Sequence, residues 1–413
     1  MKPLDACARL AGRPGRFLLH SASDADGLGG WSFAGSDPID VLEDGSFAQI
    51  EAFCRAHGHD LRSWHARDPV PRVIGWIDYE GGGWLGAYDA IARWRGDELE
   101  LIGAGAPALA RCLELGSSEP GAPPRFGALD APDDGEGGAA YLARALRILE
   151  YLRAGDVYQV NLARRLVAPL IARGDAFAIH RALVSASPAP YSAFLETSRA
   201  TIVSSSPERF LARAPGGRIE TRPIKGTRPR GASAADDLVA KEDLLAAPKD
   251  AAEHLMIVDL ERNDLGRVAV TGSVAVDEMA YVVELPTVHH LVSRVSAALR
   301  PDVGLAELLR ATFPGGSITG APKIRAMQII RELEPAPRGP YCGAIGWFGD
   351  GGALDLSIAI RIAVLDDAAI TLHVGGGIVA DSDPHAELAE TEAKAAGWRR
   401  ALAMLSSSSS GAP

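Results

Sequence analysis

Cysteine is scarce in this chain of 413 residues, and its four cysteines form no CxxC pair: Cys7, Cys54, Cys112 and Cys342. The sequence therefore indicates neither a zinc site nor a disulfide scaffold, and we expect a protein of the reduced cytoplasm. No stretch approaches eighteen uninterrupted apolar residues, and the N-terminus lacks the apolar segment and cleavage site of a secretion signal. No membrane segment is expected.

Long runs of Lys and Arg are also absent, and the formal net charge is -11. Nonspecific binding to nucleic acid or to an anionic membrane is therefore disfavoured, although a local basic pocket can still bind a small anion. The hydrophobic content of 47%, by contrast, is ample for the core of one large domain or two ordinary ones.

Changes of composition divide the chain. Residues 1–115 mix short strand-like runs with glycine clusters, whereas 116–139 is rich in Gly, Pro and Asp and has no apolar periodicity. We interpret 1–115 as an N-terminal subdomain, 116–139 as a connection and 140–405 as the larger second region. The serine-rich end, 406–413, is expected to be disordered.

The second region mixes helices with strands. Apolar residues recur at helical spacing over 141–153, and Gly155 follows as a C-cap. A hairpin is predicted at 350–352 and another turn at 366–367. Between them, the run 354–365 alternates branched apolar residues with small ones and one arginine, as in a single strand. Propensity alone predicts only a mixed α+β class.

Three ionisable residues in or beside strands are candidates for a site. Arg361 stands among small residues, which indicates a pocket wall, although an outward, solvated arginine is the alternative. Glu208 follows a strand and a proline, where it is either presented for chemistry or paired with Arg209. His290, next to His289, is either functional or structural.

Two helical segments each carry a pair of carboxylates. Asp250 and Glu253 are three residues apart, as are Glu387 and Glu390, so each pair shares one helical face. Carboxylates from two such faces can hold Mg²⁺, a hard cation that takes oxygen ligands. The alternative is two solvated faces, with Glu390 and Lys394 forming an ordinary ion pair.

The segment PIKGTRPRG, residues 223–231, places Lys225 between a proline and a glycine in a predicted loop. Pro223 restricts the backbone, while Gly226 allows close approach to a ligand. Thr227 and Arg228 add a hydroxyl and an anion-binding fork. The loop is therefore suited to aim an amine nucleophile, although an exposed basic turn is the alternative.

The segment FPGGSITGAPK, residues 313–323, has the glycine spacing of a phosphate-binding loop. Ala321 stands where that motif needs lysine, so nucleotide binding is disfavoured. Gly377, in the glycine run 375–377, allows a ligand to approach the backbone closely.

Six segments, in this order, resemble the chorismate-utilising enzymes: GDVYQVNLARR (155–165), SSSPERF (204–210), PIKGT (223–227), AEHLMIVDLERNDLGR (252–267), FPGGSITGAPKIRAM (313–327) and GGGIVADSDP with the acidic helix after it (375–394). The resemblance spans about residues 140 to 400. Within the family, PIKGT and FPGGSITGAPK are similar to component I of the aminodeoxychorismate synthases, since anthranilate synthases usually carry alanine in place of Lys225.

The resemblance implies a fold and a metal. The expected fold is α+β, with two large, mainly antiparallel sheets packed as a sandwich, helices outside and an active site between the sheets. Glu253 and Glu390 fall on the family's Mg²⁺ positions, with Asp250 and Glu387 beside them. The metal is expected to bridge to the ring carboxylate of chorismate.

The resemblance also implies roles in catalysis and binding. Lys225 is expected to be the nucleophile and Glu208 the general acid, and His290 matches a position linked to pyruvate elimination in anthranilate synthase. Arg361, with Tyr341 alongside, is expected to bind a carboxylate of the pyruvyl ether. The other expected substrate-binding residues are Gly226, Thr227, Ser317, Gly376, Gly377 and Lys394.

The function implied is amination of chorismate with ammonia, giving 4-amino-4-deoxychorismate for para-aminobenzoate and folate formation. Gln159 stands where water-activating relatives carry lysine, and a glutamine is no general base. Lys225 needs a pKa below its ordinary value, for which burial, Arg228 and Mg²⁺ are candidate causes.

No cysteine lies in a glutaminase-type elbow, so ammonia is expected from a separate glutamine amidotransferase subunit. No fused lyase domain is expected beyond residue 405. Anthranilate synthase component I and a noncatalytic relative that binds chorismate or tryptophan remain as alternatives.

Overall fold

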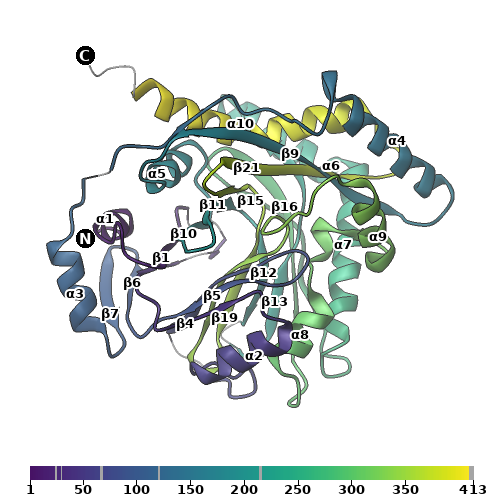
Figure 1. Ribbon diagram of the computed structural model, residues 1–413. Helices are drawn as coiled ribbons and strands as arrows, with labels where there is room; N and C mark the ends of the chain where they lie inside the picture. The colour runs from purple at the N-terminus through teal and green to yellow at the C-terminus, as the bar shows by residue number, and fades with distance from the viewer. Residues whose placement is uncertain (24–25, 29, 66–67, 120, 214–215, 409–413) are drawn as a thin grey trace.

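Long antiparallel strands with one buried face organise the structure. In β21 (Ala369–Ile378) buried and half-buried residues alternate, which is typical of a strand with a single face against a core. β21 pairs with β9 (Gln159–Ala172) along its whole length. The computed structural model describes the chain except for residues 24–25, 29, 66–67, 120, 214–215 and 409–413 (Figure 1).

The described strands form two sheets. The first contains, from edge to edge, β17 (Gly320–Ala321), β9, β21, β20 (Ile362–Leu365), β11 (Thr201–Ser206), β10 (Tyr191–Glu196), β1 (Arg16–His20), β2 (Trp31–Gly35), β6 (Ile91–Arg95) and β7 (Glu98–Ile102), with β8 (Arg125–Phe126) on β9. The second contains β14 (Ile224–Pro229), β16 (Val288–Ala297), β13 (Ile219–Arg222), β12 (Arg209–Arg213), β19 (Leu354–Ile358), β18 (Ala344–Gly349), β4 (Pro71–Ile77), β5 (Gly83–Ala87) and β3 (Asp40–Glu43), with β15 (Ala275–Glu284) on β16.

Several helices begin at ordinary start signals. Ser46 and Gln49 form a capping box at the start of α2, and Pro248 opens α7 at a position where its missing N–H is not needed. The helices are α1 (Pro3–Arg9), α2 (Phe47–Ala56), α3 (Ala106–Leu115), α4 (Ala139–Arg153), α5 (Phe177–Ala186), α6 (Ala234–Ala246), α7 (Pro248–Gly266), α8 (Leu305–Thr312), α9 (Lys323–Leu333) and α10 (Pro384–Ser408), with short turns η1 (Glu136–Gly138), η2 (Gly316–Ile318) and η3 (Asp350–Gly352).

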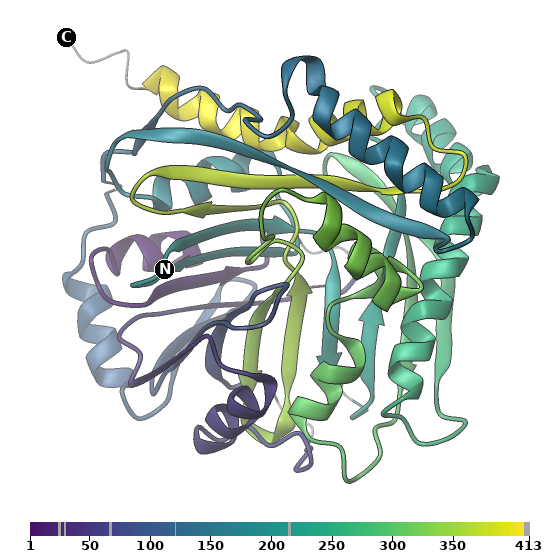
Figure 2. The same ribbon diagram turned by 45° about the vertical axis from the view of Figure 1, so that its right-hand side comes forward.

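The two sheets pack face to face. One continuous core joins Phe17 and Phe33 of the first sheet to Val73, Trp76 and Leu356 of the second. A second core lies between the first sheet and the helices α1, α3, α5 and α10. Figure 2 shows α10 and α4 lying across the first sheet, while α7 lies along the second. The expected α+β class, with two large antiparallel sheets packed as a sandwich and helices outside, is confirmed.

Strands from the first part of the chain join both sheets. β1 pairs with β10, and β4 pairs with β18. The division into 1–115, 116–139 and 140–405 stays a prediction about domains, and hydrogen-bonded sheets extend across its boundaries. The predicted disordered tail, 406–413, begins as the last turn of α10, and residues 409–413 lie outside the described residues.

The expectation of a single strand over 354–365 is wrong. β19 belongs to the second sheet and β20 to the first, so the chain crosses between the sheets at 359–361. Arg361 has a φ of 52°, a left-handed conformation that regular strands do not contain. Its side chain therefore projects from the crossing rather than from a strand face.

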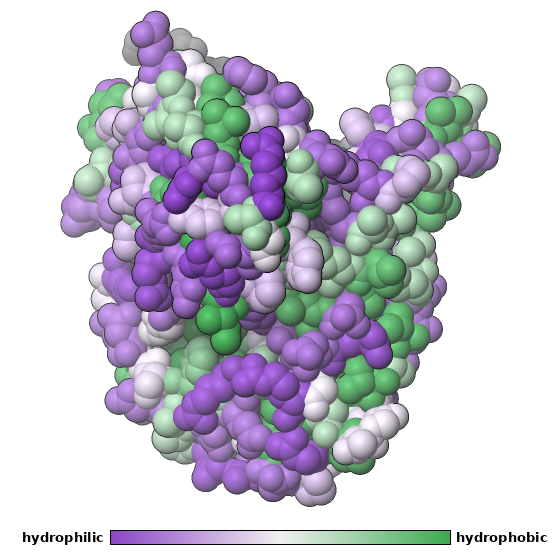
Figure 3. All heavy atoms as spheres, turned by 90° about the vertical axis from the view of Figure 1, so that its right-hand side faces the viewer, coloured by the Kyte–Doolittle hydropathy of each residue, from purple (hydrophilic) through white to green (hydrophobic). Residues whose placement is uncertain are grey.

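Hydrophobic side chains are dispersed over the surface. Figure 3 shows one face, hollowed near its upper edge, on which they are mixed with hydrophilic ones. Exposed examples lie on different helices, including Leu146 on α4, Leu255 on α7 and Ile324 on α9. None of the described helices combines the length and apolar character needed to cross a membrane.

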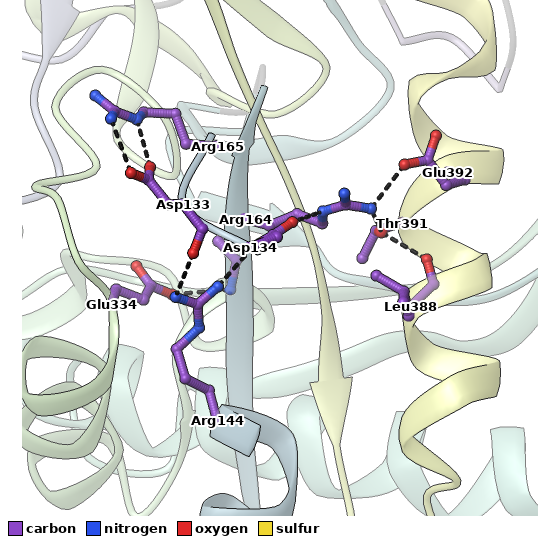
Figure 4. Close-up of polar contacts among 10 residues, drawn as sticks. Asp133, Asp134, Arg144, Arg164, Arg165, Glu334, Leu388, Thr391 and Glu392 are labelled. Atoms are coloured by element: carbon purple, nitrogen blue, oxygen red, sulfur yellow. Dashed lines mark hydrogen bonds and ion pairs between the residues drawn. The ribbon is translucent and has the colours of Figure 1, made fainter. Parts of the chain in front are cut away.

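The predicted connection is tied to the sheet by buried charges (Figure 4). Asp134, only 1% exposed, accepts hydrogen bonds from Arg144 of α4 and from Arg164 of β9. Arg164 also donates to Thr391 and Glu392 of α10, at 3.2 and 2.7 Å. Asp134 thus joins β9 to α4, and Arg164 extends the network to α10. Neither composition nor periodicity of 116–139 predicts this role.

Replacing Asp134 with Asn should destabilise the fold, because Arg164 then loses a buried counter-charge. We expect the free energy of unfolding to fall by about 3 kcal/mol. Asp133→Asn is the matched control, since its pair with Arg165 is partly exposed and should contribute less than about 1 kcal/mol. Urea unfolding of both variants measures the difference, and equal losses would contradict it.

Candidate active site

A cavity of about 650 Å³ opens between the sheets, α7 and α10. Every predicted site residue except Gly376 lines it: Glu208, Lys225, Gly226, Thr227, Asp250, Glu253, His290, Ser317, Tyr341, Arg361, Gly377, Glu387, Glu390 and Lys394. Side chains far apart in sequence therefore meet in one place, at the crossing that carries Arg361.

Lys225 lies on a short strand rather than in the predicted loop. β14 pairs with β16 at Ile224 and again at Thr227, with a shift of register between the two. Lys225 and Gly226 occupy that irregular stretch, and Gly226 has a φ of 89°. A bulge of this kind redirects a side chain. It turns the lysine into the cavity.

The Lys225 amine is buried among charges of both signs. Burial lowers its pKa, the nearby Glu253 carboxylate opposes that shift, and Lys394 adds to it. The Nζ to Glu253 Oε2 distance is 3.7 Å. Arg228, expected to lower this pKa, instead pairs with Asp250 and Asp243, so its charge is compensated. The cationic neighbour of Lys225 is Lys394.

Gly377 in β21 makes room for the Lys225 amine. A Cβ added at Gly377 would lie 2.8 Å from Lys225 Nζ and 2.9 Å from Gln159 Cδ. Only glycine therefore lets β21 approach both side chains. Gln159 is fully buried, and its amide has no hydrogen-bond partner in the described part of the chain. A free amide beside the amine is a ready contact for a ligand.

Glu208 is a buried acid at the end of β11. Burial raises its pKa to about 7, against the opposing effects of the Ser317 hydroxyl and the Ile224 N–H. That N–H lies 3.3 Å from Glu208 Oε1. The alternative pair with Arg209 is not formed, because Arg209 binds Glu220 and Asp355. The site thus holds a carboxyl that can be protonated near neutral pH.

His290 and Arg361 form a second group. The Thr227 hydroxyl lies 2.8 Å from His290 Nδ1, and Arg361 lies 3.4 Å from Nε2. Burial, with Arg361 nearby, lowers the pKa of His290 to about 3, so the imidazole is neutral. Among the described residues, no carboxylate ion-pairs with Arg361, and its buried guanidinium is available to an anionic ligand.

The carboxylates of α7 and α10 face the same cavity. Asp250 accepts a hydrogen bond from Arg228 at 2.9 Å, and Glu387 accepts one from Ser382 at 2.6 Å. Glu390 pairs with Lys394 at 2.6 Å, as the alternative reading expected, although within the cavity. Burial would raise the pKa of Glu390, but the Lys394 pair outweighs it and lowers the pKa.

These carboxylates fit a hydrated cation better than a dehydrated one. Within the described ranges, no group of three or more His, Cys, Asp or Glu side chains is gathered as a ready metal site. Mg²⁺ needs only one or two carboxylates, since it keeps several waters and binds its substrate's oxygens. A Cβ at Gly376 would lie 3.2 Å from Glu387 Oε2 and 3.7 Å from Glu390 Oε1. Glycine there keeps space beside both oxygens.

The residues of the cavity wall that the sequence analysis missed include His373, Arg338 and Asn161. His373 stacks on Tyr341 with ring centroids 5.3 Å apart. Arg338 donates to Ile318 O at 3.0 Å, and Asn161 donates to Ser317 O at 2.8 Å. Both fasten the turn that carries Ser317. Asn161 lies in the segment 155–165 that carries the resemblance, whereas His373 and Arg338 lie outside all six segments.

The sequence matches the chorismate binding enzyme family over residues 49–400, and the chain belongs to that family. It is 51% identical over 245 residues to aminodeoxychorismate synthase component 1 of Klebsiella aerogenes, covering 59% of this chain and 54% of that protein. It is 44% identical over 266 residues to anthranilate synthase component 1 of Thermus thermophilus, covering 64% of this chain and 56% of that protein.

The chain thus spans about half the length of the curated relatives it matches. Among solved structures, the menaquinone-specific isochorismate synthase of Escherichia coli has a TM-score of 0.80 at 20% identity, covering 97% of this chain and 91% of that one. At this identity the likeness concerns the fold alone.

The raised pKa of Glu208 predicts a pH-dependent stability. The pKa of Glu208 is about 7 in the folded protein, against an ordinary value of 4.5. Between pH 4.5 and 7, Glu208 is therefore ionised in the unfolded chain but still protonated in the folded protein. Stability therefore falls as pH rises through that window and stays low above it. Glu208→Gln, which cannot ionise, should exceed wild type by about 3 kcal/mol at pH 8 and match it near pH 4. Urea unfolding at both pH values measures this, and a constant difference would contradict it.

Proposed function

We propose that this chain aminates chorismate at C4 with ammonia, giving 4-amino-4-deoxychorismate for para-aminobenzoate formation. The observation that carries the proposal is the buried Lys225 amine, whose pKa is lowered inside a cavity lined by both acidic and anion-binding groups. A relative that shares 51% identity is named for aminodeoxychorismate synthesis. The name and the amine support the same chemistry.

The reaction consists of two displacements. The neutral amine of Lys225 attacks ring C2, the double bond shifts, and the C4 hydroxyl leaves as water with the proton of Glu208. Ammonia then attacks C4, the double bond returns, and the C2–N bond breaks so that the lysine leaves as a neutral amine. The new C4 ammonium returns one proton to the Glu208 carboxylate. Nitrogen is thereby placed at C4, whereas direct attack at C2 gives the ortho isomer.

The anionic groups of the substrate need partners in the cavity. Arg361 offers a buried guanidinium for a carboxylate of the pyruvyl ether, and Tyr341 lines the wall nearby. Ser317, Thr227 and the backbone at Gly377 supply neutral contacts. The neutral His290 accepts or donates one hydrogen bond without adding charge. It is not positioned as a cationic acid.

Mg²⁺ is part of the proposal. Glu253 and Glu390 would hold it, with Asp250 and Glu387 beside them, and when bound it supplies positive charge to a substrate carboxylate. Before a cation binds, Lys394 pairs with Glu390, and Lys225 Nζ lies 3.7 Å from Glu253 Oε2. Both carboxylates line the cavity.

Ammonia is proposed to come from a separate glutamine amidotransferase subunit. The name component 1 of the similar proteins supports a two-component system. Burial raises the pKa of Cys7, Cys54 and Cys342, which is opposite to what a thiolate nucleophile needs. These three cysteines are therefore unsuited to glutamine hydrolysis.

Anthranilate synthesis is the second candidate, favoured by the 44% identity to an anthranilate synthase component 1. It needs ammonia at C2 and no lysine nucleophile. The placement of Lys225 against Gly377 and Gln159 favours the C4 product. A noncatalytic relative is disfavoured, because the cavity retains its acid, amine and carboxylates.

Lys225→Ala should abolish the C4 route and leave substrate binding intact. Wild type with chorismate, Mg²⁺ and no ammonia should show a mass adduct that the variant lacks, and the variant's 4-amino product should fall at least about 100-fold. Lys249→Ala is the control, because Lys249 also lies near Glu253 but is half exposed. Near wild-type formation of 4-amino-4-deoxychorismate by Lys225→Ala would refute the covalent step.

Replacing Glu253 or Glu390 with Gln should weaken Mg²⁺ binding and activity together, because one anionic ligand is lost. We expect about a 10- to 100-fold weaker Mg²⁺ affinity by calorimetry. Asp259→Asn is the control on the exposed face of α7. Unchanged Mg²⁺ affinity in both Gln variants would remove the assignment.

A further inference from the structure

Glu261 is a buried carboxyl that the two displacements do not use. It lies on α7, is only 3% exposed, and accepts a hydrogen bond from the Gly316 N–H at 2.8 Å. Gly316 opens the η2 turn and is followed by Ser317. The Glu261 carboxyl therefore holds Gly316, which directly precedes Ser317, and Ser317 lines the cavity.

The docking of this turn requires glycine. A Cβ at Gly316 would lie 2.8 Å from Leu260 Cδ2 and 3.0 Å from Glu261 Oε1. Only a glycine backbone therefore comes close enough to α7 for the hydrogen bond. The bond links a buried carboxyl oxygen to a backbone N–H that has come within 2.8 Å.

Other ionised side chains hold the flanks of the same turn. Lys323 pairs with Asp264 and donates to Pro314 O at 2.7 Å, and Arg338 donates to Ile318 O at 3.0 Å. Lys323 and Arg338 thus bind the carbonyls of Pro314 and Ile318, which lie on either side of Gly316 and Ser317. Glu261 is the contact nearest to Ser317 on the α7 side.

Ser317 in turn meets the proposed acid. Both side chains line the cavity, and the Ser317 hydroxyl lowers the pKa of the Glu208 carboxyl, so the path from Glu261 to Glu208 runs through Gly316 and Ser317. We propose that Glu261 is a positioning residue, which fixes the Ser317 hydroxyl against Glu208 and so orients the proton that Glu208 gives to the C4 oxygen. This inference rests on the proposed function for the role of Glu208.

The charges around Glu261 agree with a structural, non-reacting role. Burial and the neighbouring Asp264 raise its pKa, while Lys323 and the Gly316 N–H oppose that shift. Glu208 also raises the pKa of Glu261. Whether ionised or protonated, Glu261 retains a carbonyl-type oxygen for the Gly316 N–H.

Two substitutions separate the contact from the charge. Glu261→Leu removes the acceptor at similar volume, whereas Glu261→Gln keeps an oxygen for Gly316. We expect Glu261→Leu to lower kcat at least about 10-fold with chorismate affinity unchanged, and Glu261→Gln to stay within about 3-fold of wild type. Asp259→Asn is the control, since it neutralises an acid on the exposed face of the same helix.

A double-mutant cycle tests whether Glu261 acts through Glu208. Glu208→Gln should lose about 100-fold in kcat, and adding Glu261→Leu should cost little more, because the acid it orients is gone. If Glu261→Leu lowers kcat by the same factor in both backgrounds, the inference is overturned. Equal kcat values for Glu261→Leu and Glu261→Gln would also overturn the inference.

A crystal structure of the Glu261→Leu variant gives a readout without activity. The Ser317 hydroxyl should move out of hydrogen-bond distance of Glu208, and it should remain within that distance in Glu261→Gln. An unmoved Ser317 overturns the inference whatever the kinetics. A wild-type protein that makes no aminated chorismate overturns the proposed function instead, so the two failures are distinguishable.

Discussion

Burial of the Lys225 amine inside the sandwich is the constraint on which the rest of the site depends. A lysine removed from water favours its neutral form, but the nearby Glu253 and Glu390 carboxylates favour the charged one. The structure balances the two by adding Lys394, which pairs with Glu390 and repels Lys225. The result is an amine that is buried, paired and still able to lose its proton.

That balance requires the two sheets to meet in an irregular way. β14 has a shifted register at Lys225, and the chain crosses between sheets where Arg361 takes a positive φ. In regular strands each of these side chains would stand out from one face of its own sheet. The departures from regular pairing bring an amine and a guanidinium into the same cavity. Local irregularity in a stable sandwich is a common way to present reactive groups.

The sequence predicts which residues line the cavity more accurately than it predicts the path of the chain. The helical carboxylate pairs, the hairpin at 350–352 and the residues of the cavity follow from spacing and from family resemblance. The crossing at 359–361 could not be predicted, because alternation of Ile and small residues continues through it. Glu261 and Asp134 were missed since each acts through a long-range contact that local composition does not encode.

The pKa of Lys225 in the metal-free protein tests the account most directly. Nuclear magnetic resonance of protein labelled at the lysine Cε and Nζ atoms can follow each lysine with pH, and Lys225→Ala assigns the signal. We predict that Lys225 titrates clearly below its ordinary value of 10.5, while exposed lysines titrate near it. A Lys225 pKa at or above 10.5 would mean that the carboxylates outweigh burial, and the amine could not serve as the nucleophile.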